Sequence, residues 1–321
     1  MKNNVSIAVL SGCFIFSLAA FGRAAQAQEG TVVATQTLVA VDAKSKPPAS
    51  ASQITVSVNG HKEPLTAWKP LDPANTQIAL LIDDGLRERV GRELVDLRTF
   101  ILTLPPGMEI MVGYMQYGHV LTAQAFTLDH VHAAATIRLP AGIVDMTESP
   151  YFCLSDFVDK WPSASEPSHG SAAATPTAQH KARFVLMLTN GVDPYGGSYV
   201  NEISPYVEDA IEDAQRAGVM VYSIYFADAG MRLGIQDFSG QDYLNRLTQA
   251  TGGVDYYEGM GNPVMIGPFL TMFQHAVAET YVATFNAPTT RDPKRDMVLV
   301  KFTAAKTKLN ATPQLRPGNM E

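Results

Sequence analysis

The feature of this sequence that most restricts its fold is a regular alternation of short apolar segments with longer amphipathic ones between residues 76 and 280. Gln77 to Ile82 and Phe184 to Leu188 are mostly apolar runs of strand length, which is typical of strands buried on both faces. Glu202 to Ala217 carries its apolar residues on one helical stripe and ends at Gly218. Strands separated by helices of this length predict an α/β fold with a doubly wound, mostly parallel sheet flanked by helices.

Both ends of the chain differ from this middle region because their patterns are those of β-strands. Ile54 to Val58 alternates apolar and polar residues and runs into Asn59-Gly60, a pair that favours the tight turn of a hairpin. Tyr281 to Phe285 and Met297 to Phe302 also have strand patterns. The predicted order of regions is a β-rich N-terminal region at 28–75, the central domain at 76–280, and C-terminal β-strands with a tail at 281–321.

The first residues have the composition of a signal peptide. Lys2 supplies a positive charge, Val5 to Phe21 is almost free of charge, and Ala25-Gln26-Ala27 forms an A-x-A cleavage site. Residues 1–27 are therefore predicted to be a signal peptide, which places the mature chain in the periplasm or outside the cell. The alternative is cleavage before Cys13, because Leu10-Ser11-Gly12-Cys13 resembles a bacterial lipobox and would leave a lipid anchor.

The overall charge limits the class of partner. The chain has 321 residues and a formal net charge of −7, without a dense Lys/Arg cluster, whereas nucleic-acid binding requires a basic face. We therefore expect no nucleic-acid partner. No apolar segment after the signal peptide is long enough to span a membrane. Residues 162–181 are rich in Ser, Ala, Pro and His, which predicts a flexible insertion within the central domain.

In an open parallel sheet, ligands bind at the carboxyl ends of the strands. Asp83-Asp84-Gly85 follows the first strand of the central region, and Thr189 to Asp193 follows the strand at Phe184 to Leu188. Thr147 to Ser149 lies in the loop before a predicted helix at Tyr151 to Lys160. The candidate binding residues at this edge are Asp83, Asp84, Gly85, Arg87, Thr147, Ser149, Asn190, Asp193 and Tyr195.

Four segments of the central region resemble parts of a known family. They are Leu81-Ile82-Asp83-Asp84-Gly85, Val185 to Gly191, Ala217 to Ile224, and Leu247 to Gly253. In this order they resemble the start of a von Willebrand factor A (VWA) domain, its fourth strand, its fifth strand and the turn into its last strand. The resemblance covers about residues 76–280, and the β flanks resemble those of exported bacterial proteins of a VWA-related group. It implies a VWA-like, Rossmann-like fold.

Most VWA domains hold Mg²⁺ or Mn²⁺ at this edge through an Asp-x-Ser-x-Ser segment, a Thr and an Asp, which supply the hard oxygen ligands that such ions prefer. Here Asp83 matches the first position, Gly85 and Arg87 replace the two Ser residues, and Asn190 replaces the last Asp. The resemblance therefore implies a degenerate metal-ion-dependent adhesion site, and no cofactor is expected. If Mg²⁺ or Mn²⁺ does bind, the expected ligands are Asp83, Asn190 and Thr147.

Two metal-free interpretations of the paired aspartates are favoured together. In one, Arg87 occupies the place of the metal and pairs with Asp83, and in the other Asp84 caps the helix after the strand. The sequence offers no nucleophile–base arrangement, and Cys153, the only thiol after residue 27, is interpreted as a buried hydrophobe. The predicted function is a non-catalytic module that binds an unknown protein partner. The alternative is divalent-metal-dependent adhesion or recognition through a non-standard site.

Overall fold

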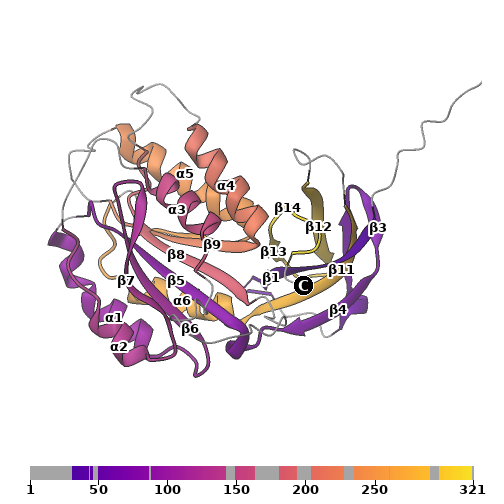
Figure 1. Cartoon of the computed structure of the whole chain (residues 1–321), viewed down its shortest axis with the longest axis horizontal. Coiled ribbons are helices and arrows are strands. Elements are labelled where there is room, and N and C mark those ends of the chain that lie inside the picture. Colours follow the sequence, from indigo (N-terminus) through magenta and orange to yellow (C-terminus); the bar gives the residue numbers. More distant parts are fainter. Residues whose placement is uncertain are drawn as a thin grey trace, which may run out of the picture.

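The computed structural model has two parts, a helix-covered sheet and a smaller β-sandwich (Figure 1). It describes residues 31–42, 44–45, 50–86, 88–141, 149–162, 181–193, 204–227, 235–259, 261–289 and 296–319, with the backbone alone at 88–89 and 235–238. The predicted signal peptide and nearly all of the predicted insertion at 162–181 lie outside these ranges. No helix among the described residues is both long and apolar enough to cross a membrane.

The central sheet has six strands in the order β10-β9-β8-β5-β6-β7. Every neighbouring pair is parallel except β6–β7, which is an antiparallel hairpin. All eight residues of β5 are buried, as the apolar run in the sequence predicts for a central strand. The strands are β5 (Thr76–Asp83), β6 (Glu109–Gln116), β7 (His119–Thr127), β8 (Ala182–Thr189), β9 (Val219–Tyr225) and β10 (Asp255–Tyr256).

Helices cover both faces of this sheet, so the predicted fold class is confirmed. One face carries α1 (Leu94–Leu102), α2 (His130–Ala135) and α6 (Gly267–Ala278). The other carries α3 (Pro150–Asp159), α4 (Pro205–Ala217) and α5 (Ile235–Thr251). Short 3-10 helices lie at η1 (Ala51–Gln53), η2 (Pro73–Asn75) and η3 (Glu88–Arg92).

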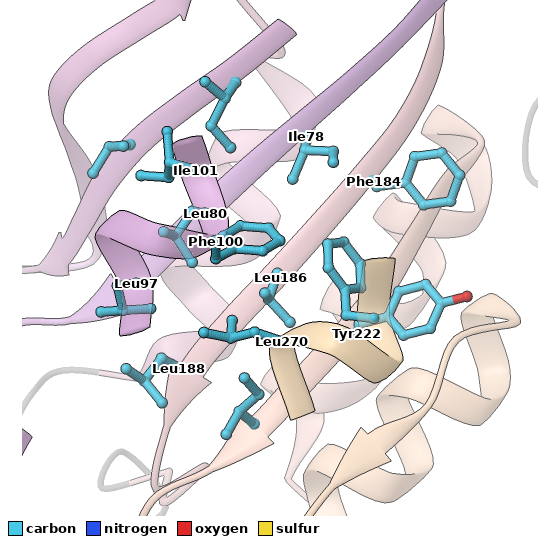
Figure 2. Close-up of a cluster of buried hydrophobic side chains, with 14 of the residues drawn as sticks. Ile78, Leu80, Leu97, Phe100, Ile101, Phe184, Leu186, Leu188, Tyr222 and Leu270 are labelled. Atoms are coloured by element: carbon cyan, nitrogen blue, oxygen red, sulfur yellow. The ribbon is translucent and has the colours of Figure 1, made fainter. Parts of the chain in front are cut away.

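Successive residues of β5 contribute to different cores because side chains alternate across a strand. Ile78 and Leu80 pack with Leu97 and Phe100 of α1 and Leu270 of α6, as Figure 2 shows. Ala79 and Leu81 of the same strand belong to the second core, under α3, α4 and α5. The amphipathic helix α4 ends at Gly218, whose left-handed φ of 65° is the conformation expected of a glycine C-cap.

The two β flanks of the sequence join in one sandwich. Its sheets have the strand orders β13-β1-β11-β4 and β14-β12-β2-β3, and one buried cluster unites Val39 and Phe285 of the first sheet with Val56 and Phe302 of the second. The turn at Asn59-Gly60 has positive φ at both residues, which confirms the predicted hairpin. The strands are β1 (Val32–Val41), β2 (Ile54–Val58), β3 (His61–Glu63), β4 (Leu65–Pro70), β11 (Thr280–Pro288), β12 (Val298–Ala304), β13 (Leu309–Ala311) and β14 (Gln314–Leu315).

The sandwich packs against the amino edge of the central sheet. Strand β1 is shared, because Leu38 and Ala40 lie in the core of the α/β part whereas Val39 lies in the sandwich core. The end of α5 is tied to the sandwich, where Thr312 Oγ1 donates to the carbonyl oxygen of Ala250 at 3.2 Å. Helix α6 leads directly into β11. The candidate site at the carboxyl edge therefore lies on the opposite side of the sheet.

Candidate functional site

The candidate site begins where the adjacent parallel strands β5 and β8 end. The Thr189 hydroxyl donates to Oδ2 of Asp83 at 2.7 Å, and the backbone N–H of Gly85 donates to Oδ1 at 2.9 Å. The same hydroxyl accepts the backbone N–H of Gly191 at 3.1 Å. Both Asp83 and Thr189 are buried. The sequence prediction that the two strand ends meet is therefore correct, and a buried side-chain hydrogen bond joins the loops that follow them.

The next residue, Asp84, is fully buried and holds a third segment. Arg138, which follows α2, forms a bidentate ion pair with it, with Nη1 to Oδ1 at 2.8 Å and Nη2 to Oδ2 at 3.0 Å. Gln116 Nε2 and the backbone N–H of Ala141 also donate to this carboxylate, at 2.9 and 2.8 Å. Four donors compensate the buried charge, as a carboxylate in the interior requires.

The guanidinium of Arg138 is itself fixed in place. It lies over the ring of Tyr114, 3.7 Å from the ring centroid, and the Tyr114 hydroxyl accepts the backbone N–H of Arg138 at 2.7 Å. The hydrogen bonds to Asp84 raise the pKa of Arg138, so the guanidinium stays protonated. Residues 137–141 are therefore held against the carboxyl ends of β5 and β6.

This arrangement differs from the sequence interpretation of Asp84. The sequence predicts that Asp84 caps the following helix, but its oxygens accept hydrogen bonds from Arg138 and from the backbone N–H of Ala141, and α1 begins after Glu93. Asp84 is fully buried, so its carboxylate anchors the loops and is not exposed at the surface. Arg138 could not be found by sequence reasoning, because it lies 54 residues from Asp84 and no local spacing relates the two.

The loop after β8 is folded on itself and clamped between two helices. Asn190 Oδ1 accepts the backbone N–H of Val192 at 3.0 Å, which closes an Asx turn. Gly191 has a φ of 66°, and its carbonyl oxygen accepts the Tyr151 hydroxyl of α3 at 2.7 Å. On its other side a Cβ at Gly191 would lie 2.4 Å from the carbonyl oxygen of Gly240 in α5, so glycine is required on both counts.

Of the remaining candidate binding residues, two lie near the starts of helices and three lie outside the described residues. Ser149 is the buried N-cap of α3 and accepts the backbone N–H of Phe152 at 3.4 Å. Asp193 accepts a hydrogen bond from Ser204, the N-cap residue of α4. Arg87, Thr147 and Tyr195 lie outside the described residues, so the predicted Arg87–Asp83 pair stays a prediction.

A hard cation such as Mg²⁺ needs several oxygen ligands directed at one point. Both oxygens of Asp83 accept hydrogen bonds from the protein, and Asn190 Oδ1 is used within its own loop. In the part of the chain that the structure describes, no three His, Cys, Asp or Glu residues are grouped to hold a metal ion. The described residues therefore fit a metal site poorly.

No family model matches the sequence, and no curated protein matches it. Solved structures do resemble the chain. A von Willebrand factor type A protein from Catenulispora acidiphila is 10% identical, with 91% of this chain and 75% of that one matched and a TM-score of 0.41. An aerotolerance-related membrane protein from Bacteroides fragilis is 12% identical (63% and 98% matched, TM-score 0.39), and the SpRpn10 VWA domain is 9% identical (59% and 98%, TM-score 0.35). Likeness at this level concerns the fold alone.

The topology itself identifies the class of domain. The segments that resemble the fourth, fifth and last strands of a VWA domain form or lead into β8, β9 and β10, which are the fourth, fifth and sixth strands of the central sheet in chain order. Helices cover both faces, as the resemblance implies. The chain therefore contains a VWA-like domain, joined to a β-sandwich made from its two flanks.

Proposed function

We propose that this chain is an exported, non-catalytic protein-interaction module that binds its partner through the carboxyl-edge loops of the VWA-like domain. The observation that carries the proposal is the hydrogen-bond network that fixes these loops to one another through Asp83, Asp84 and Gly191. Loops that are already held in one arrangement lose little conformational entropy when a partner binds.

The position of the sandwich supports the same surface. Its contacts are with the helix ends and strand beginnings of the amino edge, including Ala250 of α5 and Arg216 of α4. The carboxyl edge lies opposite and carries exposed or half-exposed positions beside the anchored ones. Ala141 is exposed although its backbone N–H is bound to Asp84, and Asp193 is half-buried. These two positions allow the surface to be changed while the anchors are kept.

The test is the affinity of the full chain for a partner purified from the same cells, measured by biolayer interferometry. Ala141→Arg places a large side chain on the loop surface but keeps the backbone hydrogen bond to Asp84. We expect it to weaken binding at least tenfold, or about 1.4 kcal/mol, because a large side chain would disrupt the interface. The matched control is Lys62→Glu on β3 of the sandwich, which should leave the affinity unchanged. A partner that binds both variants as tightly as the wild type contradicts the proposal.

The metal-dependent alternative is separated in the same assay. Metal-free contacts predict the same affinity in EDTA and in millimolar Mg²⁺ or Mn²⁺. Binding that is lost in EDTA, restored by Mn²⁺ and abolished by Asp83→Ala would establish the metal-dependent mode instead.

Export is tested by the mass of the mature N-terminus. Cleavage after Ala27 leaves a chain that begins at Gln28, as the A-x-A site predicts. An acylated chain that begins at Cys13 would assign the lipid-anchored alternative.

A further inference from the structure

A small polar cavity of about 140 Å³ lies at the amino edge of the central sheet, on the side away from the candidate site. Three segments that are far apart in the sequence line it: Lys181 and Arg183 around the start of β8, Arg216 to Gly218 at the end of α4, and Gly318-Asn319 of the C-terminal tail. By the same measure a single water needs roughly 10–15 Å³. The cavity therefore has room for a small hydrated ligand.

The positive charges of this cavity are not equally compensated. Lys181 Nζ lies 2.6 Å from Oε1 of Glu109. Arg216 forms an ion pair with Glu212 and lies 3.4 Å from Oδ1 of Asp296. Arg183 forms no hydrogen bond and no ion pair with any described residue. Its guanidinium lies over the ring of Trp161, with Cζ 5.2 Å from the ring centroid.

A guanidinium in this position is costly unless an anion accompanies it. Arg183 is partly buried, and burial lowers its pKa, but an arginine side chain stays protonated at any ordinary pH. A charge removed from water requires a counter-charge or hydrogen-bond acceptors. The face of an indole ring at this distance is a weak substitute for either. An anion in the adjacent cavity would supply the counter-charge and the hydrogen-bond acceptors.

We propose that this cavity binds a small oxyanion, with Arg183 as its principal ligand and Lys181 and Arg216 beside it. The planar fork of a guanidinium matches the paired oxygens of phosphate, sulfate or a carboxylate. The bound anion would also touch both parts of the molecule, because Asn319 is attached to the sandwich by a hydrogen bond from Gln36 N to its carbonyl oxygen at 3.0 Å. Binding is therefore expected to stabilise the attachment of the C-terminal tail to the VWA-like domain.

The experiment is thermal unfolding of the full chain in chloride, phosphate, sulfate or acetate at equal ionic strength. Phosphate or sulfate at about 100 times its dissociation constant should raise the melting temperature by roughly 5 °C over chloride. Arg183→Met should abolish this shift. In chloride alone it should not lower the melting temperature, since it removes a charge that has no ion-pair partner among the described residues. The matched control is Arg246→Met on α5, which removes an equal charge from an ion pair with Glu208 and should keep the full shift.

The anion series also distinguishes a tetrahedral oxyanion from a carboxylate. A shift confined to phosphate and sulfate assigns a tetrahedral ligand, whereas an equal shift with acetate assigns a carboxylate. Calorimetric titration of the wild type with phosphate checks binding directly, and Arg216→Gln serves as a second variant at the same cavity, with affinity reduced about tenfold. The proposal is overturned if phosphate, sulfate and acetate all act like chloride, or if Arg183→Met keeps the shift. Because the cavity lies at the opposite edge, neither result bears on the proposed binding surface.

Discussion

Two buried carboxylates in and beside the central sheet accept very different numbers of hydrogen bonds. Asp84, just beyond the central strand β5, receives four hydrogen-bond donors, two of them from one guanidinium. Asp255, on the outermost strand β10, receives one from Ser223 at 2.5 Å. Its Oδ2 is buried and accepts no hydrogen bond from the described residues, and burial raises its pKa to about 6.

This difference shows where the molecule depends on buried charge. At the centre of the carboxyl edge, ionised groups are fully paired and tie separate loops together, so they define one arrangement of the proposed binding surface. At the lateral edge, the two-residue strand β10 carries a carboxylate whose charge the fold does not compensate. The central network should therefore be sensitive to the loss of any member, whereas the lateral carboxylate should be replaceable.

The largest expected effect comes from breaking the central ion pair. Arg138→Met leaves Asp84 buried and without its cation, which should cost about 3 kcal/mol of unfolding free energy in urea titrations, at the low end for a buried pair. The low end applies because 40% of the Arg138 side chain is exposed. The matched control is Arg98→Met, which removes a single hydrogen bond to the carbonyl oxygen of Ile137 and should cost about 1 kcal/mol. Equal losses in the two variants would show that the ion pair has no special role.

A steric change to the same edge should have the next largest effect. A Cβ at Gly240 would lie 2.2 Å from the carbonyl oxygen of Asn190, so Gly240→Ala must push α5 away from the loop after β8. Because both sides of the contact are backbone, we expect a loss of about 2 kcal/mol in urea unfolding. Gly261→Ala is the control, since a Cβ there meets no atom within 4 Å. If Gly240→Ala is as stable as this control, the loop is not clamped by α5.

The sequence is sufficient for the buried strands of the central sheet, the amphipathic helix α4 and part of the site, because these depend on local patterns. Continuous apolar runs identified β5 and β8, and Asn59-Gly60 identified a hairpin. The helix predicted at Tyr151 to Lys160 forms at Pro150–Asp159. Strand β4 (Leu65–Pro70) was missed, because its half-exposed residues form no apolar run and its partner, β11, lies more than 200 residues away.

The site was predictable only where topology places residues together. Parallel neighbouring strands must end at one edge, so the meeting of Asp83 with the Thr189 to Asp193 loop followed from the pattern. The Asp84–Arg138 pair did not, since it depends on how the segment after a short helix returns to the sheet. Pairings of this kind are set by tertiary packing, and a single sequence carries no periodic signal for them.

A smaller loss is expected when the link between β5 and β8 is removed. Thr189→Val keeps the shape of the buried side chain but deprives Asp83 of a donor and the Gly191 N–H of an acceptor. We expect a cost of about 1.5 kcal/mol, measured by urea unfolding. Thr66→Val removes a hydroxyl that donates to the carbonyl oxygen of Thr284 at an exposed position, and this control should change stability by about 0.5 kcal/mol or less.

The smallest effect has the opposite sign and concerns the lateral carboxylate. Asp255 has a folded-state pKa of about 6, above its ordinary value of 3.8, so the folded protein binds its proton more tightly than the unfolded chain does. Its contribution to stability therefore falls as the pH rises from about 4 to about 6 and then stays constant. A shift of two pKa units corresponds to about 3 kcal/mol at most. Asp255→Asn removes this penalty but leaves an amide N–H₂ without a partner, which offsets about 2 kcal/mol.

Asp255→Asn should therefore be about 1 kcal/mol more stable than the wild type at pH 7, the remainder of those two opposing effects. At pH 4 both forms are uncharged at this position, so the variant should lose that advantage and be less stable by the cost of its unpaired amide. The difference between the two urea-unfolding curves, measured from pH 4 to pH 8, isolates the group, because every other titrating residue is common to both. A difference that does not change with pH would mean that Asp255 is as well compensated as Asp84, and the contrast between centre and edge would fail. If the stability of Asp255→Asn relative to the wild type rises between pH 4 and pH 6, the uncompensated charge lies on β10, as the hydrogen bonds indicate.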